Sequence, residues 1–450
     1  MTAAALVLAA LLAPDPLPRG RPARIALGAL GLLCAWTALS AGWAPLGYEA
    51  SNDAQRILLY LVVLAIAVAV WRPRGAARWV EPVLAGSVLG VTLVGLAGRL
   101  LPGVITQNTS LSAGGRLEQP LTYWNAEGAL AAMGLVLCAR IAGDRERPRA
   151  LRLAAAAATV PLATGLYLTF SRGALAALAG GLIALVVAAP TRSQLRALAA
   201  CVLPCVAGTV AAGLSDGVRG LQGSHSDQVS QGFVVLAVLV VACATAAGLT
   251  ALAIRREPAD RTAGDRLGVP PWTAPVAAAL IIALVAVPIA AGGAKTPGDK
   301  QEVAFGATNQ RLSEIGSNRP EYWRVALKAF EEDPLKGVGS SGFAVEWLKK
   351  RHITEGVHDA HSLEIETLAE LGLVGAAILA ALVGAAILGV RRAHGADAAL
   401  AAGPVAALVV WGLHASLDWD WEMPALTLVA VILLGMLLAQ ADRAEVPRGR

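Results

Sequence analysis

The sequence predicts an all-α fold: a polytopic transmembrane helical bundle of about 12 to 13 spans with one large extracytoplasmic loop containing short helices. Three observations support this prediction. The 450 residues are 56% hydrophobic and only 15% charged, with a mean hydropathy of +0.60, which is too apolar for one soluble core. Twelve apolar runs are long enough to cross about 30 Å of hydrocarbon. The loops between these runs alternate in charge.

The predicted spans are dominated by Ala, Gly, Leu and Val, whose small side chains permit close approach of neighbouring helices. A further apolar run at residues 2–13 is short and has no signal-peptide cleavage site after it, which favours a short span over a cleaved leader. The twelve predicted spans are residues 25–43, 57–71, 80–101, 126–142, 151–170, 173–189, 197–214, 232–254, 273–292, 368–390, 399–414 and 424–440.

Every second loop is rich in arginine, which is the pattern of cytoplasmic loops. We therefore expect N-terminal transmembrane helices in residues 1–292, a large extracytoplasmic loop in residues 293–362 and C-terminal transmembrane helices in residues 363–450. The net charge of +5 reflects this topology, and no nucleic-acid-binding motif accompanies it. All five cysteines fall in or beside apolar runs, so neither a disulfide framework nor a metal site is expected.

Arg172 is the first candidate functional residue on the predicted outer side. It stands in Phe170-Ser171-Arg172-Gly173, where two apolar runs meet with almost no loop between them. Two interpretations remain open. The arginine is an interfacial anchor, or it is an anion site, because a guanidinium keeps its charge and presents a planar fork to phosphate oxygens.

The large loop contains a predicted amphipathic helix on or near the membrane. Pro320 suits its first turn, and Asp333-Pro334 ends it. The glycines within residues 337–342 allow the backbone to pass close to another segment, although such clusters are also typical of simple turns. Four residues give the helix an apolar side: Tyr322, Trp323, Leu327 and Phe330.

His361 lies just before the span predicted at residues 368–390, on the outer side. Glu364 is about one helical turn away and could orient the imidazole. His358 competes for any role given to His361. A surface histidine is commonly solvated and inert, so a catalytic role remains one of two interpretations at this point.

These motifs occur in an order that resembles the O-antigen ligase and O-antigen polymerase superfamily. The resemblance covers roughly residues 50–440 and departs from the common pattern at Ser362 and Trp124. The motifs that carry it are Ser171-Arg172-Gly173, Arg319 followed by Trp323, Pro334-Leu335-Lys336-Gly337-Val338-Gly339, His361 followed by Glu370-Leu371-Gly372-Leu373-Val374-Gly375, Tyr123-Trp124-Asn125, and the turn at residues 414–424.

The resemblance implies a glycosyltransferase that moves a glycan from an undecaprenyl-pyrophosphate carrier to an acceptor hydroxyl. Such enzymes act at the outer face of the cytoplasmic (inner) membrane and use no nucleotide sugar, metal or other cofactor. It implies that Arg172 and Arg319 stabilise the pyrophosphate leaving group and that His361 is the general base. Membrane lipid and a glycan, lipid or protein acceptor are the expected partners, and nucleic acid is not. The residues expected to bind substrate are Arg324, Asn125, Glu364 and Asp418.

Other functions remain open from the sequence. A polysaccharide polymerase of the same superfamily would use the same groups. A flippase or exporter is another class, but transporters place ionisable groups near mid-membrane, and here the predicted span centres are almost free of charge. A catalytically inactive envelope scaffold is a third. Asp418 and Asp420 form a pair that gives a second enzyme interpretation, in which a carboxylate is the base.

Overall fold

The computed structural model confirms the all-helical prediction. Every regular element in the described part of the chain is a helix. The residues that the structure describes are 17–106, 108–257, 265, 267–268, 270, 272–281, 283, 306–308, 312 and 317–445.

The helices follow one another along the chain with short connections. The α-helices are α2 (Arg21–Ser40), α3 (Gly47–Val70), α4 (Arg74–Ala77), α5 (Val80–Leu100), α6 (Trp124–Gly143), α7 (Arg149–Leu168), α8 (Arg172–Ala188), α9 (Arg192–Leu214), α10 (Asp216–Gly220), α11 (His225–Arg255), α14 (Arg319–Glu332), α15 (Phe343–Lys350), α16 (Leu363–Ala396), α17 (Ala398–Ala415) and α18 (Pro424–Glu445). Two short 3-10 helices are η1 (Leu111–Ala113) and η2 (Asp420–Glu422).

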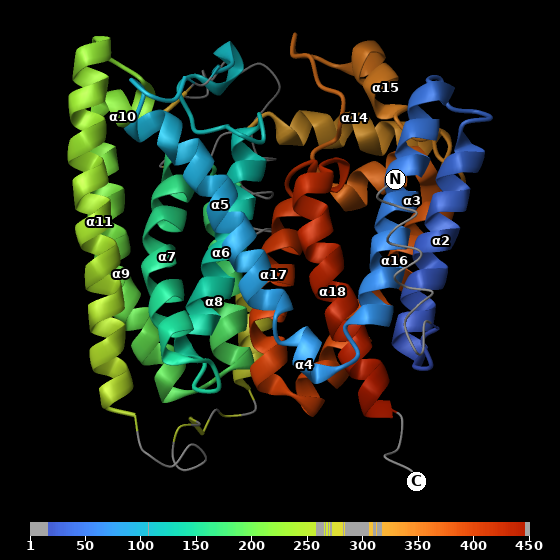
Figure 1. Cartoon of the computed structure of the whole chain (residues 1–450). Helices are drawn as coiled ribbons and strands as arrows, with labels where there is room; N and C mark the ends of the chain where they lie inside the picture. The colour runs from blue at the N-terminus through green and yellow to red at the C-terminus, as the bar shows by residue number, and fades with distance from the viewer. Residues whose placement is uncertain are drawn as a thin grey trace.

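Most of the predicted spans are confirmed as upright helices of one bundle (Figure 1). Within the described residues, 10 helices are long and apolar enough to cross a membrane, and α8 is a shorter apolar helix. Together they account for all the predicted spans except that at residues 273–292, half of which lies outside the described residues. The short run at residues 2–13 lies wholly outside them.

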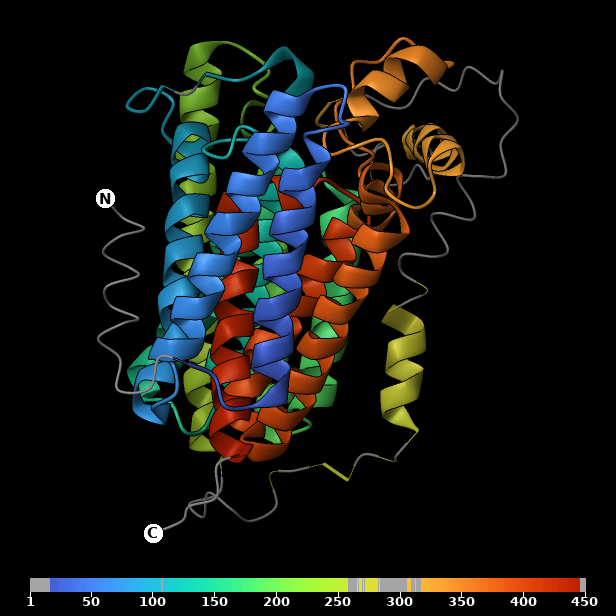
Figure 2. The ribbon, with the colours of Figure 1, turned by 90° about the vertical axis from the view of Figure 1, so that its right-hand side faces the viewer.

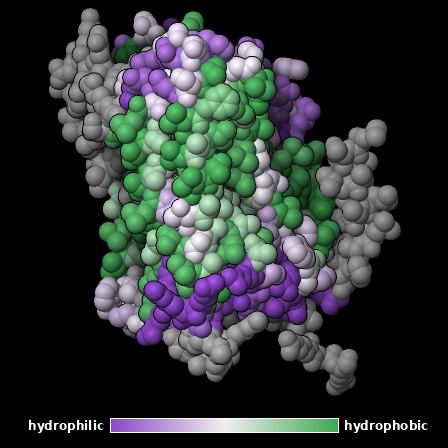
Figure 3. Space-filling model, turned by 60° about the vertical axis from the view of Figure 1, so that its left-hand side comes forward, coloured by the Kyte–Doolittle hydropathy of each residue, from purple (hydrophilic) through white to green (hydrophobic). Residues whose placement is uncertain are grey.

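The surface has the polarity that a bilayer requires. On the face that Figure 3 shows, a hydrophobic band crosses the middle of the bundle, and hydrophilic residues gather at its two ends. The arginine-rich loops meet at one end, where Arg74 pairs with Asp397 at 2.6 Å and Arg147 pairs with Glu81 at 2.9 Å. Helix α18 ends there, whereas α14 and α15 lie at the opposite end (Figures 1 and 2). The protein is therefore a multi-pass membrane protein with its large loop on the arginine-poor side.

Helix α6 is the centre of the bundle. Its span is 94% buried, because α5, α7, α8, α9 and α17 all pack around it. A second core joins α2, α3, α16 and α18. Small residues face these contacts, and they let the helix backbones approach closely.

Helix α14 confirms the predicted amphipathic helix, with Pro320 in its first turn and Asp333 just after its end. It lies across the end of the bundle and packs on α15 and α16 (Figure 1). Its buried stripe differs from the predicted one. Leu327 is 43% exposed because it lies beside the stripe that faces α16 and not within it. The buried residues are Tyr322, Trp323, Val325, Ala326 and Ala329.

Helix α16 is broken where the sequence predicts one continuous span. Gly372 has φ 63° and ψ −163°, which interrupts the helical backbone nine residues after its start. The segment at residues 334–339 fills the break. The Val338 and Gly339 amides donate to the carbonyls of residues 369 and 370, at 3.0 and 2.8 Å. In return, the amides of residues 373 and 374 donate to the carbonyls of residues 334 and 335, at 2.9 and 3.2 Å. These four hydrogen bonds thus give partners to the backbone amides and carbonyls that face each other at the break.

Candidate active site

Arg319 and Asp418 form the centre of the candidate site. Arg319 is the first residue of α14, and its Nη2 lies 2.6 Å from Oδ2 of Asp418, which is 1% exposed. Burial alone would raise the pKa of Asp418. The positive charge of Arg319, with smaller contributions from His361 and His414, outweighs burial and lowers the pKa. Asp418 is therefore an anion at neutral pH that holds the guanidinium in place.

The start of α6 supplies two more groups to Asp418. Tyr123 Oη donates to Asp418 Oδ1 at 2.7 Å, and Asn125 Nδ2 donates to Asp418 Oδ2 at 2.8 Å. Asn125 also donates to Tyr123 Oη at 2.8 Å. Three segments that are far apart in the sequence thus meet at one carboxylate. Asn125, predicted to bind substrate, acts here on Asp418 and fixes its orientation.

His361 stands in a conformation that fixes the state of its ring. Its φ is +56°, a region that residues with a side chain rarely adopt and that often marks functional sites. Nδ1 lies 2.9 Å from the backbone oxygen of Asp359. Because a carbonyl oxygen only accepts, Nδ1 carries the hydrogen, and in the neutral ring Nε2 holds the lone pair. The ring packs on Tyr322, with 5.1 Å between centroids.

His414 and Asp420 form a buried pair that the sequence analysis did not predict. His414 Nδ1 lies 2.6 Å from Asp420 Oδ2, and both residues are 0% exposed. No hydrogen-bond partner for Nε2 of His414 is found in the described part of the chain. A Cβ built on Gly173 would lie 3.4 Å from this nitrogen, so the ring faces the first turn of α8. The spacing of a histidine at the end of a span and an aspartate six residues later was a signal that could have been used.

Arg172 is the first residue of α8 and is half-buried. Ser171 caps the helix, because its hydroxyl accepts from the Ala174 amide at 3.3 Å. The contact between Gly173 and His414 brings this turn beside the pair just described. Arg172 therefore lies at the same end of the bundle as Arg319, next to a helix N-terminus, which itself favours anions.

Two of the predicted substrate-binding residues have other partners. Arg324 binds Glu321 through Nε at 2.7 Å and the Lys350 carbonyl through Nη2 at 2.6 Å. Glu364 is exposed and accepts from Ser362 and Ser416, at 3.2 and 2.8 Å. The group bonded to the His361 ring is the Asp359 carbonyl, where the sequence suggested Glu364.

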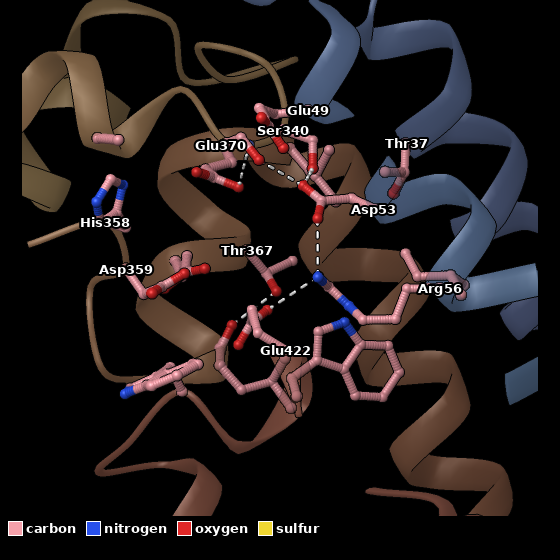
Figure 4. A pocket seen from close by; sticks show the side chains of 18 of the residues that line it. Thr37, Glu49, Asp53, Arg56, Ser340, His358, Asp359, Thr367, Glu370 and Glu422 are labelled. Atoms are coloured by element: carbon pink, nitrogen blue, oxygen red, sulfur yellow. Dashed lines mark hydrogen bonds and ion pairs between the residues drawn. The ribbon is translucent and has the colours of Figure 1, made fainter. Parts of the chain in front are cut away.

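A polar cavity of about 330 Å³ opens beside the candidate site (Figure 4). We call it the acidic cavity, because six carboxyl groups line it. Arg56 lies among them, with Nη1 2.9 Å from Asp53 Oδ1 and Nη2 3.3 Å from Glu422 Oε1. The lining carboxyl groups belong to Glu49, Asp53, Asp359, Glu366, Glu370 and Glu422.

An apolar cavity of about 340 Å³ lies below the acidic cavity, between α16, α17 and α18. The two cavities share Leu363 and Trp421 in their walls. The apolar one extends along α16 as far as Arg391, so it runs through the membrane-spanning part of the bundle. Its mainly apolar walls extend from beside the candidate site toward the arginine-rich end of the bundle.

Three carboxylates of the acidic cavity, Asp359, Glu366 and Glu422, have oxygens within 4.8 Å of one another. Hard cations prefer such oxygen ligands. However, the Arg56 guanidinium already pairs with Glu422, and the Ala360 amide donates to Glu366 at 2.6 Å. Protein donors thus already use some of the carboxylate oxygens that a metal ion would need as ligands.

The comparison with curated proteins gives no match. A family model described as O-antigen ligase matches residues 157–380. The matched segment contains Arg172, Arg319 and His361, whereas Asn125 and Asp418 lie outside it. It also contains the two interlocked segments at residues 334–339 and 369–374. This chain belongs to the superfamily of O-antigen ligases and O-antigen polymerases.

Proposed function

We propose that this protein is a glycosyltransferase of the O-antigen ligase type. It transfers a glycan from an undecaprenyl-pyrophosphate carrier to an acceptor hydroxyl on the extracytoplasmic face of the inner membrane. The reaction needs no metal and inverts the anomeric carbon. The observation that carries the proposal is the ion pair of Arg319 with the buried carboxylate of Asp418, with the His361 ring packed on Tyr322 of the same helix, α14.

His361 is the general base. The Asp359 carbonyl holds the hydrogen on Nδ1, so Nε2 of the neutral ring is available to accept the proton of the acceptor hydroxyl. The packing of Tyr322 on the ring limits its rotation. A base of this kind is needed because an alcohol keeps its proton at neutral pH.

Arg319 and Arg172 bind the pyrophosphate of the donor. In Arg319, Nη2 is bonded to Asp418, while Nε has no hydrogen-bond partner among the described residues. One donor of the fork therefore stays available for a phosphate oxygen. Arg172 adds a second positive charge at the start of α8.

The transfer is then a single displacement. Nε2 of His361 takes the hydroxyl proton while the acceptor oxygen forms a bond to the anomeric carbon. The bond between that carbon and the phosphate oxygen breaks, and its electron pair stays on the pyrophosphate. The arginines stabilise the charge that grows there, so the leaving group needs no general acid.

Proteoliposomes with purified protein test this proposal. The donor is undecaprenyl pyrophosphate carrying a radiolabelled glycan, and the acceptor source is the envelope fraction of a deletion strain. We expect label to move from the acid-labile carrier linkage into an acid-stable product, equally well in the presence of EDTA. The products are separated by mass, which also distinguishes a single transfer from a lengthened polymer.

The result that would overturn the proposal is movement of the labelled carrier across the bilayer with no transfer of its glycan. That result would indicate a transporter. A metal requirement for transfer would leave the glycosyltransferase function intact and would contradict the metal-independent mechanism.

A further inference from the structure

The acidic cavity carries an inference beyond the transfer step. Its walls come from α2, α3, the outer part of α16, η2 and the loop before α15 (Figure 4). Its volume of about 330 Å³ falls within the range of small-ligand pockets, which begins at about 300 Å³. It is therefore large enough for a sugar ring and much larger than a bare metal ion needs.

The polar groups of the acidic cavity are held in fixed positions. Ser340 and Ser341 donate their hydroxyls to Asp53 Oδ2 at 2.8 and 2.7 Å. Glu370 accepts the backbone amides of Ser341 and Phe343 at 2.9 and 3.0 Å. Such contacts pre-organise the carboxylates, which lowers the ordering cost when a ligand binds.

The cavity is poorly suited to the donor pyrophosphate. Six carboxyl groups face it, and Arg56, the arginine among its described lining residues, is already paired with Asp53 and Glu422. A pyrophosphate would bind here without an available guanidinium to offset its charge. The arginines assigned to the donor, Arg172 and Arg319, do not line this cavity. The cavity thus suits a neutral ligand that supplies hydrogen-bond donors.

An unpaired hydroxyl gives independent evidence for a ligand. Thr37 lines the cavity and is 0% exposed, yet its Oγ1 has no hydrogen-bond partner within the described residues. A buried hydroxyl without a partner destabilises the protein, because it has lost its hydrogen bonds to water. A bound molecule with polar groups would remove that cost.

The other lining groups match a saccharide. Trp419 and Trp421 line the cavity and offer apolar ring surface. Sugar rings combine apolar faces with several hydroxyls that donate to carboxylates. The cavity also lies beside the proposed general base, because Asp359 lines it and its carbonyl accepts from His361 Nδ1 at 2.9 Å.

We propose that the acidic cavity is the acceptor subsite, where a neutral saccharide binds with its attacking hydroxyl directed toward His361. This inference rests on the proposed glycosyl transfer and assigns its acceptor to a chemical class. The carboxylates and Thr37 hold the hydroxyls of the saccharide, and the two tryptophans contact its faces.

The first experiment identifies the chemistry of the acceptor. The envelope fraction of the deletion strain is treated with mild periodate, which destroys vicinal diols, or with a protease, before the proteoliposome assay. We expect periodate to abolish acceptor activity and the protease to leave it unchanged. The opposite pattern would overturn the inference while leaving glycosyl transfer established. An absence of glycan transfer to the untreated fraction would instead contradict the proposed function itself.

The second experiment tests the location with Thr37→Val and Glu366→Gln. Each removes hydrogen-bonding capacity from the cavity with almost no change of shape. We expect the acceptor concentration at half-maximal rate to rise about 3- to 10-fold, as for loss of one hydrogen bond, with an unchanged half-saturating donor concentration. The matched control is Thr250→Val in α11, because Thr250 is also buried with an unpaired hydroxyl but does not line this cavity.

An unchanged acceptor dependence in both cavity variants would overturn the assignment. So would saturable binding of Ca²⁺ or Mg²⁺ that is lost in Glu366→Gln and is required for transfer, because the carboxylates would then form a cation site. Thermal unfolding of each detergent-purified variant shows whether it is folded before its kinetics are compared.

Discussion

Gly337 and Gly372 lie backbone against backbone, and neither position has room for a side chain. A Cβ on Gly337 would lie 2.4 Å from the Glu370 carbonyl, and a Cβ on Gly372 would lie 2.4 Å from the Leu335 carbonyl. Both glycines have positive φ, at 70° and 63°. The segments that contain these glycines, 35 residues apart in the sequence, therefore form one interlocked structure.

We expect Gly372→Ala to lower the stability of the folded protein, because alanine disfavours this φ and its methyl group would displace the Leu335 backbone. Gly384→Ala in the same helix is the control, since nothing lies within 4 Å of its Cβ position. Thermal unfolding in detergent measures both variants. A melting temperature for Gly372→Ala equal to that of Gly384→Ala would show that the interlock does not stabilise the fold.

Arg319→Lys should lower transfer about 10- to 100-fold, which corresponds to the 1.5–3 kcal/mol of a hydrogen bond to a charged group. A lysine keeps the charge but cannot bind Asp418 and a phosphate oxygen with one planar fork. Arg172→Lys should act in the same direction. Arg324→Lys is the matched control on α14, because Arg324 pairs with Glu321. Initial rates at saturating acceptor measure the effect, and full activity in both Arg319→Lys and Arg172→Lys would exclude a bidentate anion clamp.

His361→Ala should reduce transfer by about 10²- to 10⁴-fold, the usual contribution of a general base. Donor binding should persist because the arginines remain. His352→Ala is the control on the same loop, where the exposed imidazole contacts Glu321. Near-normal turnover of purified His361→Ala would place the base elsewhere, with Asp418 the next residue to test.

The orientation predicted from the arginine-rich loops is tested by cysteine labelling in intact cells. Gly356→Cys lies in the large loop and Gly395→Cys lies at the far end of α16, and both positions are exposed with open space around them. In a background without the native cysteines, we expect a membrane-impermeant maleimide to label residue 356 alone. Labelling of residue 395 alone would invert the topology and with it the side of the active site.

The acidic cavity should make stability depend on pH. Burial raises the pKa of Glu422 well above its usual range, although Arg56 opposes the shift. As pH rises above about 4.3, the unfolded chain therefore releases this proton before the folded protein does, and stability falls. Glu422→Gln removes the effect, so its melting temperature relative to wild type should increase between pH 5 and pH 8. Glu331→Gln, at an exposed position on α14, should show no such trend.

The spans and the loop helix could be predicted from the sequence because lipid imposes them locally. Each helix must satisfy its own backbone and present apolar side chains, so every span carries its own signal. The same local logic explains why Arg172, Arg319 and His361 stood out as polar groups between apolar runs. The family resemblance added Asn125, and the turn at residues 414–424 added Asp418, although neither indicated that the two are bonded to each other.

The pairings could not be predicted, because they depend on how distant helices pack. Asp53 and Glu422 reach the acidic cavity from α3 and η2, with no shared spacing in the sequence. The partner of Glu364 could not be predicted for the same reason, since Ser416 comes from the end of another span. The break at Gly372 is likewise visible only once the segment that fills it is in place.

The bonds that fill this break join main chain to main chain, so they do not depend on most side chains nearby. Substitutions around the acidic cavity can therefore accumulate without changing the register between the end of α14 and the outer part of α16. The separation between the start of α14, with Arg319, and the segment before α16, with His361, is therefore fixed by main-chain geometry and does not depend on which side chains line the cavity.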